Sequence, residues 1–151
     1  MSVTYSFLDV NCAISGPGGS LILSEGGVAG EGITIAFVED KSSMLIGADG
    51  EGMHSLKATK AARITVRLLK NSPLNAALNA MYRFQTTGTG AYHGQNTISL
   101  SNPLWGDEHA CQQCAFVKHP DNVNAIEGGT NEWLFDSIKT DTVLGDGSLV
   151  L

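Results

Sequence analysis

The stretch "ARITVRLLKNSPLNAALNAMY", residues 62–82, contains the two periodicities that decide the fold. Its first eight residues alternate between apolar and polar side chains, as a strand with one buried face does. The apolar face would carry Ala62, Ile64, Val66 and Leu68, and the polar face Arg63, Thr65 and Arg67. The pattern predicts a strand whose apolar face packs on a core.

The second half of the same stretch changes to a helical period. Apolar residues fall at i, i+3, i+4, i+7 and i+8, which gives one apolar stripe along a helix. These residues are Leu74, Ala77, Leu78, Met81 and Tyr82. Ser72 suits an N-cap, and Pro73 suits the first helical position, where no N–H is needed. We expect one α-helix over about residues 73–86, with its apolar stripe on a sheet.

Further strand patterns occur along the rest of the chain. They are "YSFLDVNCAI" (5–14), "SLILS" (20–24), "ITIAFVED" (33–40), "SSMLIGA" (42–48), "NTISLS" (96–101), "CAFVKH" (114–119) and "EWLFDSIKTDTV" (132–143). In the first, Leu8, Val10, Cys12 and Ile14 would share a face. Glycine makes up 18 of 151 residues, or about 12% against a usual 7%. About eight strands and one helix predict a mainly β fold: a β-sandwich or partly open barrel with one flanking helix.

Two glycine-punctuated segments interrupt this pattern within what we expect to be a single domain of residues 1–151. Residues 24–32, "SEGGVAGEG", cannot pack a core and predict a flexible arm. Residues 33–40 and 42–48 predict a hairpin, with its turn at Asp40, Lys41 and Ser42. Residues 47–60, "GADGEGMHSLKATK", then predict a long loop, and loops above about 12 residues are usually functional or disordered.

Charge is unevenly distributed along the chain. The net charge of -6 argues against general affinity for nucleic-acid phosphates. Residues 1–56 carry seven acids and one base, Lys41, whereas residues 57–83 carry six bases and no acid. Two hypotheses follow: copies of the chain meet head to tail through complementary segments, or the segments neutralise each other within one fold.

The pair Cys111 and Cys114 raises the question of a metal or redox site. A structural zinc site needs more ligands than this one pair offers, and in an extended strand residues three apart point to opposite faces. A redox pair would need a helix N-terminus, which "ACQQCAFV" does not indicate. We therefore interpret both as strand residues, with reduced thiols, and expect no metal.

No other motif indicates catalysis. The chain has no P-loop, no G-x-S-x-G elbow and no EF-hand loop, and His54, His93, His109 and His119 are scattered. We expect no enzymatic activity and no cofactor. The N-terminal residues lack a signal-peptide pattern, and no apolar run approaches the roughly 20 residues of a membrane span. A soluble chain that is not exported is the expectation.

Several of these segments together resemble the tail tube proteins of contractile-tailed bacteriophages, in the short single-domain family of the inner tube. The segments are "TYSFLDV" (4–10), "EDKSSMLIGADGEGMHSL" (39–56), residues 62–82, "GQNTISL" (94–100), "CAF" (114–116) and "GGTNEW" (128–133). The resemblance covers nearly the whole chain, and the strand-Ser-Pro-helix block is its most specific part.

The resemblance implies a virion structural protein, assembled in the bacterial host cytoplasm. Its copies would form hexameric rings that stack into a hollow tube, and the joined sheets would form a continuous inner β-barrel through which the DNA passes. The implied partners are other copies of the chain, the tail sheath protein, the tape measure protein in the lumen, and the baseplate or tail-tip and tail terminator proteins. DNA would pass without specific binding, and no membrane insertion is implied.

Two residue sets follow as hypotheses on that basis. The lumen would be lined by Thr34, Ala36 and Asp40, with Ile33, Ile35 and Phe37 toward the core. The contact between rings would use Asp49, Glu51, Met53 and His54, with Lys57, Lys60, Arg63 and Arg67 as partners for the acids of a neighbour.

Two other classes stay open from the sequence. The first is a tube subunit of a contractile secretion system, or a small β-barrel binding protein. The second is an enzyme or metal protein that uses His109, Cys111 and Cys114.

Overall fold

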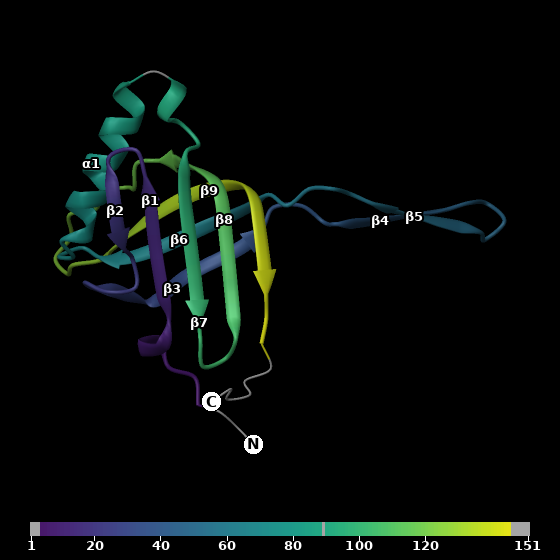
Figure 1. Ribbon diagram of the computed structural model, residues 1–151, viewed down its shortest axis with the longest axis horizontal. Helices are drawn as coiled ribbons and strands as arrows, with labels where there is room; N and C mark the ends of the chain where they lie inside the picture. Colours follow the sequence, from purple (N-terminus) through teal and green to yellow (C-terminus); the bar gives the residue numbers. More distant parts are fainter. Residues whose placement is uncertain (1–3, 89, 146–151) are drawn as a thin grey trace.

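An antiparallel sheet of seven strands forms the body of the protein over residues 4–88 and 90–145, which the computed structural model describes. The strand order is β2-β1-β7-β8-β9-β6-β3. The bounds are Asn11–Gly16 (β1), Gly19–Ile22 (β2), Val28–Phe37 (β3), Ala62–Leu69 (β6), Asn96–Asn102 (β7), Asp107–Lys118 (β8) and Thr130–Val143 (β9). The sheet curls into a half-barrel (Figure 1). The predicted mainly β class is therefore confirmed.

The long strand β9 joins the two layers of this half-barrel. Its first part, Thr130–Ser137, pairs with β6, and residues 134–143 pair with β8. Figure 1 shows β1, β2, β7 and β8 in one layer, crossed by β6 and β3 in the other. Because β9 bends between them, one continuous sheet encloses the core from two sides.

The core lies between these layers and consists of the inward residues of each strand. In β6 the side chains of Ala62, Ile64, Val66 and Leu68 are buried, which confirms the predicted alternation. Trp133 and Phe135 on β9 are the largest fully buried side chains. Burial of each such apolar side chain stabilises the fold by roughly 1.5–3 kcal/mol.

One α-helix, α1, spans Leu74–Thr87 and covers one side of the sheet (Figure 1). This agrees with the predicted bounds to within one residue. The N-cap is Pro73, one residue after the expected Ser72. Ser72 Oγ still accepts a hydrogen bond from the backbone N–H of Leu74, at 3.3 Å, and so contributes to the helix start. Leu78 and Met81 are buried on the sheet side. Within the described residues, no helix is long and apolar enough to cross a membrane.

Polar side chains fix both ends of α1 to the sheet. Asn75 near its start accepts a hydrogen bond from Trp133 Nε1 at 3.0 Å. Gln85 near its end exchanges two hydrogen bonds with Asn96 of β7, at 2.7 and 2.9 Å, and also donates to the carbonyl of Pro17. All three contacts satisfy polar groups that burial would otherwise leave unpaired.

The predicted hairpin between residues 33–40 and 42–48 is wrong. Strand β3 pairs instead with β6, and β4 (Ser42–Ile46) pairs with β5 (Gly52–Leu56) in a separate two-stranded sheet. The expected loop 47–60 therefore contains a strand. The Asp49-Gly50 turn, with Gly50 at φ +89°, lets the chain reverse between β4 and β5, as Asp-Gly often does in hairpins.

The expectation of a flexible arm over residues 24–32 is wrong for its second half, which belongs to a strand. Val28–Gly32 belongs to β3, and Ala29 is buried. The backbone carbonyl of Gly27 accepts a hydrogen bond from the N–H of Leu69 at 2.7 Å. Backbone pairing does not depend on side chains, so glycine is tolerated here. The register shifts between Val28 and Ile33, where a bulge interrupts the pairing with β6.

The predicted first strand begins later than expected. Residues Phe7–Asp9 form a short 3-10 helix, η1, which Ser6 caps through a hydrogen bond from Leu8 N–H. Val10, Cys12 and Ile14 are buried as expected, but Leu8 is 93% exposed. A second 3-10 helix, η2, spans Gly90–Tyr92.

Candidate assembly surfaces

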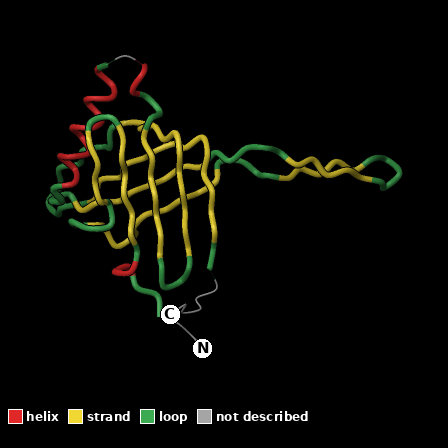
Figure 2. Tube along the Cα trace, in the orientation of Figure 1, coloured by secondary structure: helices red, strands yellow, loops and turns green. Residues whose placement is uncertain are grey.

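The β4–β5 hairpin projects from the body as a long arm (Figures 1 and 2). Every residue from Phe37 to Ala58 is exposed. The five cross-strand pairs run from Ser42–Leu56 to Ile46–Gly52. An isolated two-stranded hairpin is at best marginally stable in water, so an arm of this kind is expected to be stabilised by a partner.

Exposed apolar side chains occupy both faces of the arm. The pair Leu45 and Met53 lies on one face, and the neighbouring pair Met44 and His54 lies on the other. Met44, Leu45, Ile46, Met53 and Leu56 are each 54–82% exposed. Clustered exposed apolar side chains mark an interaction surface. Because they occur on both faces, the arm is suited to insertion between surfaces.

The tip of the arm is acidic and held by its own hydrogen bonds. The N–H of Gly47 donates to the carbonyl of Glu51 at 2.6 Å, and the N–H of Gly50 donates to the carbonyl of Gly47 at 3.1 Å. Asp49 Oδ1 accepts from the N–H of Glu51 at 3.1 Å. The tip therefore presents two carboxylates on a turn of small residues.

The residues predicted for ring-to-ring contact separate into two groups. Asp49, Glu51, Met53 and His54 lie together on the outer part of the arm, and Lys57 lies at its root, all of them exposed. Lys60, Arg63 and Arg67 lie outside the arm and are paired within the chain. The distances are 3.0 Å from Lys60 to Asp141, 2.8 Å from Arg63 to Asp136, and 3.3 and 3.5 Å from Arg67 to Glu31 and Glu132.

These pairs show that three of the six bases in residues 57–83 are neutralised by acids of the same chain. Arg63 donates two hydrogen bonds to the carboxylate of Asp136, and this hydrogen bonding, followed by the charge of Asp136, raises the pKa of the guanidinium. The acid side chains of the four pairs are 49–79% exposed, so each pair contributes little to stability.

The predicted lumen residues are placed on two different elements. Thr34 and Ala36 are exposed on β3 and point away from the core, and Arg67 donates a hydrogen bond to Thr34 Oγ1 at 2.9 Å. Ile33 and Ile35 pack against the core, as expected. Phe37, expected in the core, is 52% exposed. Asp40 lies beyond the end of β3, in the exposed root of the arm.

Strands β2 and β3 end the sheet and pair on one side only. Each therefore has a row of backbone N–H and C=O groups facing away from the sheet, and such edges are sites where another chain can add a strand. The opposite ends of one curled sheet thus offer two edges at which a further strand can pair.

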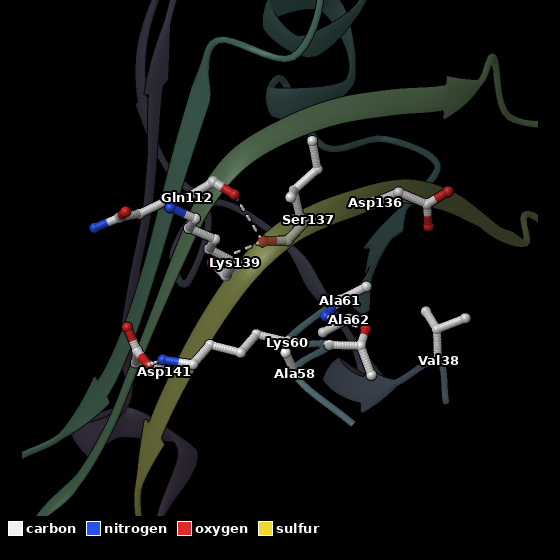
Figure 3. Close-up of a pocket in the computed structure, with 12 residues that line it drawn as sticks. Val38, Ala58, Lys60, Ala61, Ala62, Gln112, Asp136, Ser137, Lys139 and Asp141 are labelled. Carbon is white, nitrogen blue, oxygen red and sulfur yellow. Dashed lines mark hydrogen bonds and ion pairs between the residues drawn. The ribbon is translucent and has the colours of Figure 1, made fainter. Parts of the chain in front are cut away.

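A groove of about 840 Å³ lies at the root of the arm. Figure 3 shows the residues that line it, which come from the end of β3, the return segment before β6, and the middle of β8 and β9. Val38 and Ile138 are 58% and 62% exposed at the groove. No sequence pattern predicts this groove, because its lining residues come together only through strand pairing.

The expectation that Cys111 and Cys114 point to opposite faces is wrong. A bulge in β8 shifts its register against β7, and Gln113 within it has φ +54°. The extra residue turns Cys114 back to the face of Cys111, so both thiols are fully buried in the core. Burial raises the pKa of Cys114 to about 11. Both lie on a strand, as expected, and are free thiols.

The histidines occupy separate environments. His109 Nδ1 lies 3.1 Å from Thr142 Oγ1, and His119 Nε2 lies 3.0 Å from Asn79 Oδ1. In residues 4–88 and 90–145, no three His, Cys, Asp or Glu side chains are grouped so that they could hold a metal ion. The open hypothesis of a site at His109, Cys111 and Cys114 gains no support from this arrangement.

Comparison with known proteins gives a family match over nearly the whole chain. Residues 1–145 match the family described as the bacteriophage PhiTE tail tube protein. No curated protein matches the chain.

Two solved structures of contractile systems are similar to the chain. The cryo-EM structure of the anti-feeding prophage cap, the tube terminating cap, has a TM-score of 0.50 at 8% identity and covers 96% of this chain and 95% of its own. The sheath-tube complex of the PVC extracellular contractile injection system, in its extended state, has a TM-score of 0.47 at 10% identity, with 88% of each chain covered. The first likeness concerns the fold alone. Because the family match spans residues 1–145, the chain belongs to the phage PhiTE tail tube protein family.

Proposed function

We propose that the chain polymerises as hexameric rings that stack into the inner tube of a contractile phage tail, and that the phage DNA is delivered through this tube. The observation that carries the proposal is the β4–β5 arm, residues 42–56, with apolar side chains exposed on both faces. Such a surface marks an interaction site, and membership of a tail tube family supports other copies of the chain as the partner.

Within a ring, the free edges of β2 and β3 are the proposed joining surfaces. Pairing between them would close each sheet edge and produce one continuous barrel around the lumen. Thr34 and Ala36 stay candidates for lumen-lining residues because both point away from the core. A net charge of -6 favours passage of DNA without binding, since like charges repel.

Between rings, the arm is the proposed contact. Asp49, Glu51, Met53 and His54 lie on its outer part, and Lys57 at its root can meet an acid of a neighbour. Lys60, Arg63 and Arg67 would have to exchange their own acids for those of a neighbour, which makes them weaker candidates.

The other proposed partners follow from this position in the tail. The sheath protein would surround the tube, the tape measure protein would occupy the lumen during assembly, and the tail-tip and terminator proteins would bind the two ends. A structural role of this kind involves no catalysis.

The test is electron microscopy of the concentrated protein beside a variant in which residues 42–56 are replaced by a short Gly-Ser linker. We expect hollow tubes from the natural chain and single rings from the variant, because the variant keeps the sheet edges and loses the stacking arm. Tubes of normal length from the variant would show that the arm does not stack rings. Monomers of the natural chain at every concentration would contradict the tube function itself.

A further inference from the structure

The groove at the root of the arm is lined by two lysines and two aspartates, and both aspartates are paired within the chain, Asp141 with Lys60 and Asp136 with Arg63. Its floor contains alanine residues that leave space, among them Ala58 and Ala61, and Val38 and Ile138 are exposed at it. Gln112 and Lys139 add polar groups (Figure 3). A volume of about 840 Å³ is in the upper part of the range of ligand-sized sites, so a short turn of chain can enter it.

The two lysines of the groove differ in their surroundings. Lys60 Nζ is held by Asp141 at 3.0 Å, and the carbonyl of Lys60 accepts a hydrogen bond from the N–H of Thr140 at 3.0 Å. Lys139 is exposed and makes no ion pair within residues 4–88 and 90–145. The groove therefore offers one cation, Lys139, that is available to an incoming carboxylate.

The tip of the arm has the matching chemistry. Residues 47–51 are small except for Asp49 and Glu51, and the turn is shaped by its own hydrogen bonds. The Asp49 carboxylate is used within the turn, whereas Glu51 makes no ion pair within the described residues. Glu51 and Lys139 are thus complementary groups on two separate surfaces of the same chain.

The length of the arm sets how far apart the tip and the groove of one subunit lie. Val38 lines the groove, and Asp49 lies at the tip, 11 residues further along the chain. At 3.3–3.6 Å per residue, an extended chain of this length spans roughly 36–40 Å. A second copy displaced by about this distance along the arm would bring its own groove to the tip. Donor and acceptor surfaces differ, so the contact is heterologous, and a displacement of each copy along the arm repeats it as an open stack and not as a closed ring.

We propose that the tip of each arm, residues 47–51, docks in the root groove of a subunit in the next ring, with Glu51 paired to Lys139. This inference rests on the proposed tube function and names the receiving surface of its ring-to-ring contact. The arm then sets the axial repeat of the tube, which cannot exceed about 40 Å, and is shorter if the arm is inclined to the tube axis.

The three native cysteines allow a direct cross-linking test, because they are at most 1% exposed and do not compete with introduced thiols. The test protein is Glu51→Cys with Lys139→Cys, assembled into tubes and oxidised by dissolved oxygen with a copper catalyst. Two thiols then give one disulfide, and their electrons and protons pass to oxygen. We expect a ladder of dimers, trimers and longer species on a non-reducing gel, which a reductant returns to monomer.

The matched control is Glu51→Cys with Thr86→Cys, since Thr86 is exposed on α1, which lies on the opposite side of the body from the arm (Figure 1). A ladder from Glu51→Cys with Lys139→Cys alone supports the docking. No ladder in tubes seen by electron microscopy, or an equal ladder from the control, overturns it while leaving the tube function intact. Failure of the natural chain to form tubes contradicts the tube function instead.

Charge exchange gives an independent measurement that needs no oxidation. We expect Glu51→Lys to stop stacking at the stage of rings, and Glu51→Lys with Lys139→Glu to restore tubes. Both positions are exposed, so circular dichroism should show the natural fold in each variant. Long tubes from Glu51→Lys alone would overturn the pairing.

Discussion

At the scale of single residues, the reciprocal pair of Gln85 and Asn96 joins the end of the helix to the sheet. Both side chains are buried, at 3% and 0% exposed, and each amide donates to the other. A Cβ on Gly16 would lie 2.0 Å from Asn96 Oδ1, so the absence of a side chain at residue 16 is required for the pair. Sequence patterns do not predict this pair, because neither residue belongs to an apolar period.

Asn96→Ala should lower the free energy of unfolding by about 1–3 kcal/mol, because the amide of Gln85 loses a buried partner. Urea denaturation followed by circular dichroism measures the loss. The control is Thr97→Ala, exposed on the same strand, which should change stability by less than about 0.5 kcal/mol. Equal effects of the two substitutions would contradict the role of the amide pair.

Local sequence patterns did not predict the direction of the Cys114 side chain. The strand over "CAFVKH" was predicted, but the bulge at Gln113, which turns Cys114 inward, depends on register against β7 and has no local sequence signal. Cys12 lies in the same buried cluster as Cys111 and Cys114. Desolvation by burial, followed by the charge of Cys111, raises the pKa of Cys12 from 9.0 to about 12.

This shift makes stability dependent on alkaline pH. The fold disfavours the thiolate, so the contribution is fully present below about pH 9, where the unfolded thiol is neutral, and is lost as pH rises toward 12. The unfolding free energy should fall by up to about 1.4 kcal/mol per pH unit per thiol over this window. Urea titrations of the natural chain and of Cys12→Ala would measure it. A slope unchanged in Cys12→Ala would contradict the assignment.

At the scale of elements, the segments with a clear apolar period were predicted correctly, and the segments without one were not. The strand Ala62–Leu69 and the helix Leu74–Thr87 each show one strict period, and both formed where expected. Strand β4 was predicted within residues 42–48, but β5 and its pairing with β4 were not. The "MHSL" after the turn lacks alternation with polar residues, since both faces of β4–β5 are exposed in the subunit. The pairing of β3 with β6 is non-local, and periodicity carries no information on it.

The apolar pair on one face of the arm can be tested without disturbing the body. Leu45→Ser with Met53→Ser should leave the unfolding midpoint unchanged, because both side chains are more than half exposed in the subunit. Stacking should weaken by roughly 3–6 kcal/mol per contact if both become buried there. Sedimentation and electron microscopy should then show rings in place of tubes.

The matched control on the same face is Ser43→Ala with Ser55→Ala, which form the adjacent cross-strand pair. This variant should stack normally because it removes no apolar area. If the Leu45 and Met53 variant stacks as well as this control, the face is not an interface.

At the scale of the whole molecule, the chain combines a body with two open sheet edges and an arm that cannot be stable alone. The edges are suited to joining subunits side by side, and the arm with its root groove is suited to joining them end to end. Composition and glycine content predicted the mainly β class, and the resemblance predicted the family. The directions of the two kinds of contact could not be predicted, because they depend on how the curled sheet places its edges and its arm.

The most direct measurement is cryo-electron microscopy of the assembled natural chain. We expect six-fold rings around a central channel, with β2 of one subunit beside β3 of the next and an axial repeat of at most about 40 Å. Solid fibres, closed dimers, or a hollow tube in which the arms contact only their own ring would contradict the account.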